Sequence, residues 1–245
     1  MSFIEKSHKK SITIIVPAFN EELNLAETIN SIDSAILAYD LSVEIIIVND
    51  GSLDGTKQIA NLLASKDSRI RTVHLPKNQG LGNAYFTGVK EATKDYVVMI
   101  PGDNECGAEA LSPLLLILGE SDMIIPYPIN SEIRSKFRQV TSKIFTTLVN
   151  CLAGLQIYYY NGTVIHRRDL LQRCPIRSKG FAYQAKIIIY MVYNGANYQH
   201  APIKLNRNKT RASSAFRFKN FISVGHSLLQ IMLYRLFRKI EWFSS

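Results

Sequence analysis

The chain has 245 residues, of which 47% are hydrophobic, and this is enough for one large α/β domain. Its net charge of +9 favours anionic partners such as nucleotides or lipid phosphates. No aromatic–basic recognition motif accompanies the charge, so no nucleic-acid partner is expected. Cys106, Cys151 and Cys174 lack the spacing of a metal site and cannot all pair, which indicates a reducing compartment.

The N-terminus indicates a cytoplasmic protein. Residues 1–10 are polar and lack the apolar core of a signal peptide. No uninterrupted apolar stretch reaches the roughly 20 residues of a transmembrane helix. We therefore expect a cytoplasmic chain, soluble or peripheral on the inner membrane face.

Strands and helices are predicted to alternate along the chain. Apolar, β-branched runs predict strands at residues 11–17, 43–48, 70–75, 96–100 and 122–128. Helical periodicity follows each of the first three strands, at residues 23–37, at residues 59–63, and after residue 84 in a helix that reaches Thr93. This alternation predicts βαβ units with right-handed crossovers and a mainly parallel sheet.

The fourth predicted strand ends at two carboxylates. Pro101 and Gly102 close the strand, and Asp103 and Glu105 follow. Ligands of open α/β sheets bind beyond the carboxyl ends of the strands, and two carboxylates there suit Mg²⁺ or Mn²⁺ on a diphosphate. The alternative is an acidic turn in which Asp103 or Asn104 has a capping role.

Polar turns also follow the first three strands. Glu21 and Asp50 can accept hydrogen bonds from a base edge or a ribose, and Gly80 allows close backbone approach. Each segment alone could be an ordinary turn. Their position at the ends of successive strands favours a ligand site.

Four segments together resemble the family 2 glycosyltransferases of the GT-A fold, and within them the dolichol-phosphate-mannose-synthase-like, polyprenyl-phosphate branch. The segments are residues 14–22, 46–56, 78–84 and 102–105. The resemblance implies an α/β, Rossmann-like GT-A domain over residues 1–216. An amphipathic helical tail is expected over residues 217–245.

The resemblance also implies a UDP- or GDP-sugar donor. The residues that it assigns to the nucleotide are Pro17, Ala18, Phe19, Glu21, Asp50, Gly80 and Asp103. It assigns Mg²⁺ or Mn²⁺ to Asp103 and Glu105. The family motif commonly reads Asp-x-Asp-x-Gln. In this chain Pro101 occupies the position of the first Asp, and Glu105 occupies the position of the Gln. One carboxylate is lost and one is gained, so the number of carboxylates is unchanged.

Basic and aromatic residues follow the fifth predicted strand. Arg134 and Arg138 precede an amphipathic helix at about residues 140–155 and can grip phosphate, although they could also be a solvated helix start. Relatives carry arginines in this loop, so the resemblance implies a catalytic role for both. The tyrosines at residues 158–160 could stack on a sugar or form a packing cluster.

The segment at residues 180–186 resembles the place where relatives position the acceptor, and Tyr183 is assigned to it. Relatives usually carry an acidic residue in the helix here, where this chain has Gln184 and Lys186. Transfer to a hydroxyl needs a base, whereas an ionised phosphate does not, so the pattern favours a phosphate acceptor. His166 and His200 are the remaining base candidates, and both could be structural.

The last segments are basic and amphipathic. The loop residues assigned to acceptor or phosphate binding are Arg207, Lys209, Arg211 and Ser213, and a solvated loop is the alternative. Residues 217–243 have an apolar face with basic flanks, typical of a helix in a membrane interface. The same face could instead pack on the domain or on a second copy in a homodimer.

We therefore predict an inverting hexosyltransferase that moves a sugar from a nucleotide-diphosphate sugar to a dolichyl or undecaprenyl phosphate. One alternative acceptor is a glycan hydroxyl in cell-surface polysaccharide synthesis. Another alternative, prompted by Pro101 and Lys186, is a nucleotide-binding regulator without catalysis.

Overall fold

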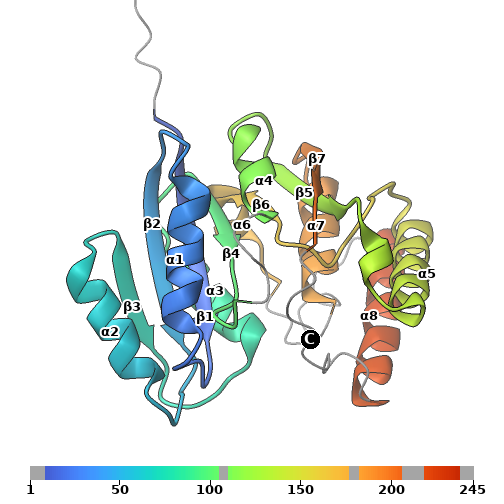
Figure 1. Cartoon of the computed structure of the whole chain (residues 1–245). Coiled ribbons are helices and arrows are strands. Elements are labelled where there is room, and N and C mark those ends of the chain that lie inside the picture. The colour runs from blue at the N-terminus through green and yellow to red at the C-terminus, as the bar shows by residue number, and fades with distance from the viewer. Residues whose placement is uncertain (1–8, 105–109, 177–181, 206–217, 238–245) are drawn as a thin grey trace, which may run out of the picture.

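A computed structural model of the chain describes residues 9–104, 110–176, 182–205 and 218–237. It contains one seven-stranded sheet with the strand order β3-β2-β1-β4-β6-β5-β7 (Figure 1). The strands are β1 (Ser11–Ala18), β2 (Ser42–Asn49), β3 (Ile70–His74), β4 (Tyr96–Met99), β5 (Met123–Pro128), β6 (Ile165–Arg167) and β7 (Tyr198–Ile203). The helices are α1 (Leu25–Ile36), α2 (Thr56–Lys66), α3 (Leu81–Glu91), α4 (Ser112–Leu116), α5 (Lys136–Ala153), α6 (Arg168–Arg173), α7 (Tyr183–Tyr193) and α8 (Phe218–Phe237), with a 3-10 turn at Ser131–Ile133.

The sheet is mainly parallel, as the sequence predicts. Strands β1 to β4 pair in parallel, as do β5 and β7, and β6 runs antiparallel between β4 and β5. The carboxyl ends of all strands except β6 therefore meet at one edge, here called the carboxyl edge. The five predicted strands are confirmed as β1 to β5, with shifts of at most one residue at their ends. Strands β6 and β7 complete the sheet, and the sequence reading missed β7.

The core lies on both faces of the sheet. All eight residues of β1 are buried. Ile14 packs in a cluster that contains the inner residues of α1, whereas Ile15 packs in the cluster that contains those of α3 and α7. This alternation follows from the two-residue period of a strand. Helices α1, α2 and α4 thus cover one face, and α3, α5, α7 and α8 cover the other.

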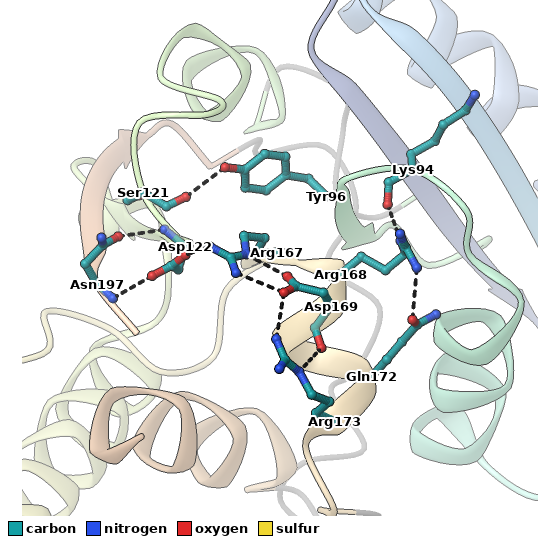
Figure 2. Close-up of polar contacts among 10 residues, drawn as sticks. All are labelled: Lys94, Tyr96, Ser121, Asp122, Arg167, Arg168, Asp169, Gln172, Arg173 and Asn197. Carbon is teal, nitrogen blue, oxygen red and sulfur yellow. Dashed lines mark hydrogen bonds and ion pairs between the residues drawn. The ribbon is translucent and has the colours of Figure 1, made fainter. Parts of the chain in front are cut away.

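An ion-pair network closes the opposite, amino edge of the sheet (Figure 2). Arg167, at the end of β6, donates to Asp122 at 2.8 Å and to Asp169 at 2.6 Å, and Arg173 also pairs with Asp169. The bond from Arg167 holds the pKa of Asp169 at about 2. Because this network and a neighbouring cavity of about 500 Å³ lie away from the carboxyl edge, we interpret the basic residues after β6 as structural.

Helix α8 is joined to the domain through a buried lysine. Lys186 of α7 is only 1% exposed, and its Nζ donates to Oε1 of Gln230 on α8. Burial lowers the pKa of Lys186 to about 8. Among the described residues no helix is both long and apolar enough to span a bilayer.

This buried amine predicts a dependence of stability on pH. Between pH 8 and the ordinary pKa of 10.5, the unfolded chain keeps a proton that folded Lys186 has lost, so the unfolding free energy rises with pH. We expect wild type to gain stability relative to Lys186→Met across this range and the difference to stay constant at lower pH. Urea unfolding of both proteins at a series of pH values measures this, and a flat difference throughout would contradict the lowered pKa.

Candidate active site

The loops that follow β1 and β2 are bonded to each other at the carboxyl edge. Asn20, with a positive φ of 56°, accepts through Oδ1 from the amide of Leu53 at 2.9 Å. Glu22 accepts from the amide of Gly55 at 2.7 Å, and the amide of Glu21 donates to Thr56 Oγ1 at 2.8 Å. The predicted nucleotide residues 17–21 therefore form one unit with the loop after β2.

Asp50 orders the loop that leads into α3. Its carboxylate is buried and accepts from the amides of Gln79 and Gly80, each at 2.8 Å. Gly51, with φ 68°, lies against this loop, because a Cβ there would be 2.4 Å from the carbonyl carbon of Lys77. Both carboxylate oxygens thus have backbone donors, and a further contact of Asp50 with a nucleotide stays a prediction.

Asp103 lies beside the first of these loops. Beyond the strand β4, the amide of Gly102 donates to the carbonyl of Pro17 at 2.9 Å. Thr28 of α1 donates to the carbonyl of Gly102 at 2.9 Å, and Asn104 is buried with φ 53°. Asp103 is therefore fixed between two anchored residues, next to the predicted nucleotide residues Pro17 and Ala18.

The surroundings of Asp103 fit a divalent cation that takes most of its ligands from the substrate. Asp103 provides one hard oxygen donor, and Glu105 lies outside the described residues. No cluster of three or more His, Cys, Asp or Glu side chains occurs among the described residues. Mg²⁺ commonly binds one or two carboxylates together with substrate phosphates, which is the arrangement that this edge permits.

A second group of predicted residues lines a cavity of about 500 Å³ after β5. We call it the Arg134 pocket, and its lining residues are Tyr127, Pro128, Ser131, Arg134, Gln139, Val140, Ser142, Lys143, Thr146, Thr147, Tyr158 and Tyr159. Nη1 of Arg134 donates to the hydroxyl of Tyr159 at 3.0 Å, and its guanidinium lies 5.9 Å from the centre of that ring. The pocket thus joins the predicted Arg134 with two tyrosines of the predicted cluster.

The other predicted residues are distributed more widely. Arg138 lies in the first turn of α5, where its amide donates to Ser135 Oγ, but it does not line the pocket. Tyr183 packs near Tyr85 and Phe86, with its hydroxyl 3.7 Å from Met99 Sδ at the end of β4. The predicted basic-loop residues, Arg207, Lys209, Arg211 and Ser213, lie outside the described part of the chain.

Both histidine candidates have structural surroundings. His166 is buried in the sheet, where burial lowers its pKa to about 3 and Nε2 contacts Gln184 at 3.1 Å. The ring of His200 stacks on that of Tyr158 with the ring centres 4.1 Å apart, and Nε2 of His200 accepts a hydrogen bond from the backbone amide of Tyr158. Lys143 of the pocket was missed, because spacing alone does not show which face of α5 meets β5.

The sequence matches the description "Glycosyl transferase family 2" over residues 13–183. The chain belongs to this family. The expected assignment to the glycosyltransferases is therefore confirmed.

Curated relatives agree with the predicted branch. The chain is 28% identical over 213 residues to the polyprenol monophosphomannose synthase of Mycolicibacterium smegmatis, covering 82% of this chain and 79% of that protein. It is 40% identical over 93 residues to the uncharacterized glycosyltransferase EpsJ of Bacillus subtilis, covering 38% of this chain and only 26% of that protein. The chain thus spans much less than the full length of some relatives.

Solved structures confirm the GT-A fold. Glucosyl-3-phosphoglycerate synthase from Mycobacterium tuberculosis, crystallised with Mn²⁺, UDP and phosphoglyceric acid, superposes with a TM-score of 0.66 at 17% identity, covering 92% of this chain and 78% of that one. Staphylococcus aureus TarS gives a TM-score of 0.58 at 21% identity, covering 94% of this chain and 72% of that one.

Asp50→Ala tests whether the loop that Asp50 orders before α3 takes part in nucleotide binding. The substitution removes both acceptors of the Gln79 and Gly80 amides, so we expect UDP or GDP affinity to fall roughly tenfold even with EDTA present. Isothermal titration measures the affinity, and Asp40→Ala, at an exposed site paired with Lys9, is the control. Equal affinity of Asp50→Ala and wild type would remove Asp50 from the nucleotide site.

Asp103→Asn tests the metal assignment. The amide keeps the shape of the side chain but loses the charge, so we expect metal-dependent turnover to fall on the order of a hundredfold or more. Thermal unfolding with Mn²⁺ and nucleotide should show that the fold is kept and that the metal-dependent stabilisation is lost. Glu105→Gln restores the family residue and should keep substantial activity. Full turnover by a folded Asp103→Asn protein would exclude Asp103 as a ligand.

Proposed function

We propose that this chain transfers a sugar from a nucleotide-diphosphate sugar, with Mg²⁺ or Mn²⁺, to the phosphate of a polyprenyl phosphate. The observation that carries the proposal is the composition of the Arg134 pocket. The pocket provides two cationic side chains, Arg134 and Lys143, with hydroxyl groups around them, and none of its described lining residues is Asp or Glu.

This composition favours an ionised acceptor. A sugar hydroxyl must lose a proton as it attacks, and a carboxylate or histidine usually accepts it. A phosphate oxygen already carries negative charge near neutral pH, so it needs cations to hold it and no base. Arg134 offers a planar guanidinium with several donors, which suits phosphate oxygens.

The residues at the carboxyl edge would bind the nucleotide and the cation. The unit formed by residues 17–21 and Asp50 would hold the nucleotide, and Asp103 would hold a cation that offsets charge on the leaving diphosphate. An acceptor oxygen held by Arg134 attacks the anomeric carbon as the bond to the nucleotide diphosphate breaks, which inverts that centre. The electron pair of the broken bond leaves with the nucleotide diphosphate.

The relatives support the choice of acceptor. Besides the mycobacterial polyprenol monophosphomannose synthase, they include an undecaprenyl-phosphate 4-deoxy-4-formamido-L-arabinose transferase of Shewanella sediminis, 22% identical over 90% of this chain and 66% of that protein. Both names give a polyprenyl acceptor.

Arg134→Met tests the acceptor site. Because the change removes the guanidinium and leaves the carboxyl-edge loops intact, we expect KM for polyprenyl phosphate to rise at least about tenfold, with nucleotide affinity unchanged. Transfer of radiolabelled sugar into the lipid fraction gives the kinetics. The control is Lys90→Met, at an exposed position of α3 away from the pocket.

Two results would overturn the proposal. Transfer only to water-soluble glycans would mean a hydroxyl acceptor. Nucleotide binding without transfer to any acceptor would favour the non-catalytic regulator.

A further inference from the structure

One side of α8 is used by the domain itself. Ser227, Gln230, Ile231 and Tyr234 recur at helical spacing and are buried. The ring of Tyr234 stacks with that of Tyr193 on α7 at 5.8 Å, and Nη1 of Arg235 donates to the carbonyl of Cys151 on α5 at 2.8 Å. This helix is therefore packed on α5 and α7, and only its other side remains available.

Large apolar side chains are exposed along α5. Phe137, Val140, Ile144 and Leu148 follow one another at intervals of three and four residues, so they form one stripe on the helix. Their exposed fractions are 61%, 56%, 52% and 44%. An ordered row of this kind on a helix that already packs on its other side indicates a binding surface.

The outward side of α8 adds further apolar surface. Leu229 and Leu236 are 48% and 65% exposed and lie opposite the buried residues of that helix. Phe237, which is 54% exposed, lies at the end of the helix on the side of Gln230. Helices α5 and α8 contact each other at one end of the molecule, away from α1 and α2 (Figure 1). We call the exposed apolar residues of the two helices the α5–α8 surface.

The charged residues of the two helices are of one sign. The sequence of α5 contains three basic residues, that of α8 contains two, and neither contains Asp or Glu. Lys136 and Lys143 are exposed and seven residues apart, so they flank the apolar stripe on the same side of α5. Two copies of such a face would repel each other, whereas an anionic lipid surface complements it.

We propose that the α5–α8 surface binds an anionic phospholipid bilayer. The apolar side chains of the stripe enter between the headgroups, and Lys136 and Lys143 contact lipid phosphates. Val140 and Lys143 also line the Arg134 pocket, so docking in this way brings the mouth of the pocket to the bilayer. The inference goes beyond the sequence interpretation, which assigned membrane contact to the tail at residues 217–245 alone.

Co-sedimentation of the full chain with vesicles tests the proposal without donor or acceptor substrate. We expect binding to phosphatidylcholine vesicles that contain phosphatidylglycerol, little binding to phosphatidylcholine alone, and weaker binding at high salt. Because no sugar is transferred in this assay, its failure leaves the proposed acceptor chemistry intact. Likewise, a wrong acceptor would not change the lipid binding.

Matched variants locate the surface. Ile144→Ser/Leu148→Ser should lower binding roughly tenfold or more, because two inserting side chains are lost. Lys136→Gln/Lys143→Gln should remove most of the salt-sensitive binding. The control is Leu37→Ser/Leu116→Ser, which removes two exposed leucines outside the surface. Thermal unfolding of each variant shows that the fold is kept.

Three results would overturn the proposal. The first is no binding of wild type to anionic vesicles. The second is an equal loss of binding in the control variant. The third is a wild-type dimer that Ile144→Ser/Leu148→Ser converts to a monomer while vesicles bind neither protein, which would make the surface a contact between copies of this chain.

Discussion

The position of strand β1 between β2 and β4 is the constraint on which the candidate site depends. Parallel pairing sets Ala18 opposite Asn49, and the same ladder continues past β4 to the bond between Gly102 and Pro17. Three loops from distant parts of the sequence must therefore end at one point. A shift of the register by one residue would turn the buried side chains of β1 toward the wrong face and would separate Asp103 from the nucleotide loops.

The second half of the sheet places the two parts of the site on different strands. One short antiparallel strand, β6, lies between β4 and β5, so the strands that lead to the Asp103 turn and to the Arg134 pocket are two strand spacings apart, or about 10 Å, where they pair with β6. The two parts of the proposed site therefore depend on the order of the strands and not on any single residue.

The sequence predicts the parts of this arrangement that depend on local pattern. Apolar, β-branched runs determine the strands, and their ends locate Asp50 and Asp103. The missed strand β7 is interrupted by Gln199, His200 and Pro202, which weaken the strand pattern.

Contacts between distant segments were not predictable in the same way. The partners of Asp50 lie 29 and 30 residues away, and the buried bond of Lys186 to Gln230 spans 44. In the sequence, Lys186 is recognisable only as a residue that stands where relatives usually carry an acidic side chain. Its contact with α8 depends on how two helices meet, which no local pattern encodes.

The late position of β7 in the chain has a consequence for biosynthesis. Strand β5 pairs with β7 along all six of its residues, yet 69 residues separate the end of one from the start of the other. During synthesis β5 is therefore complete well before its neighbour exists, and an uncovered strand of this kind tends to pair with other chains. On this side the amides of Met123 and Ile129 donate to the carbonyls of Asn197 and Ile203. Because backbone groups alternate sides along a strand, Pro126 and Pro128 lie on the other side, and their missing amide hydrogens leave this edge free to pair until β7 is made.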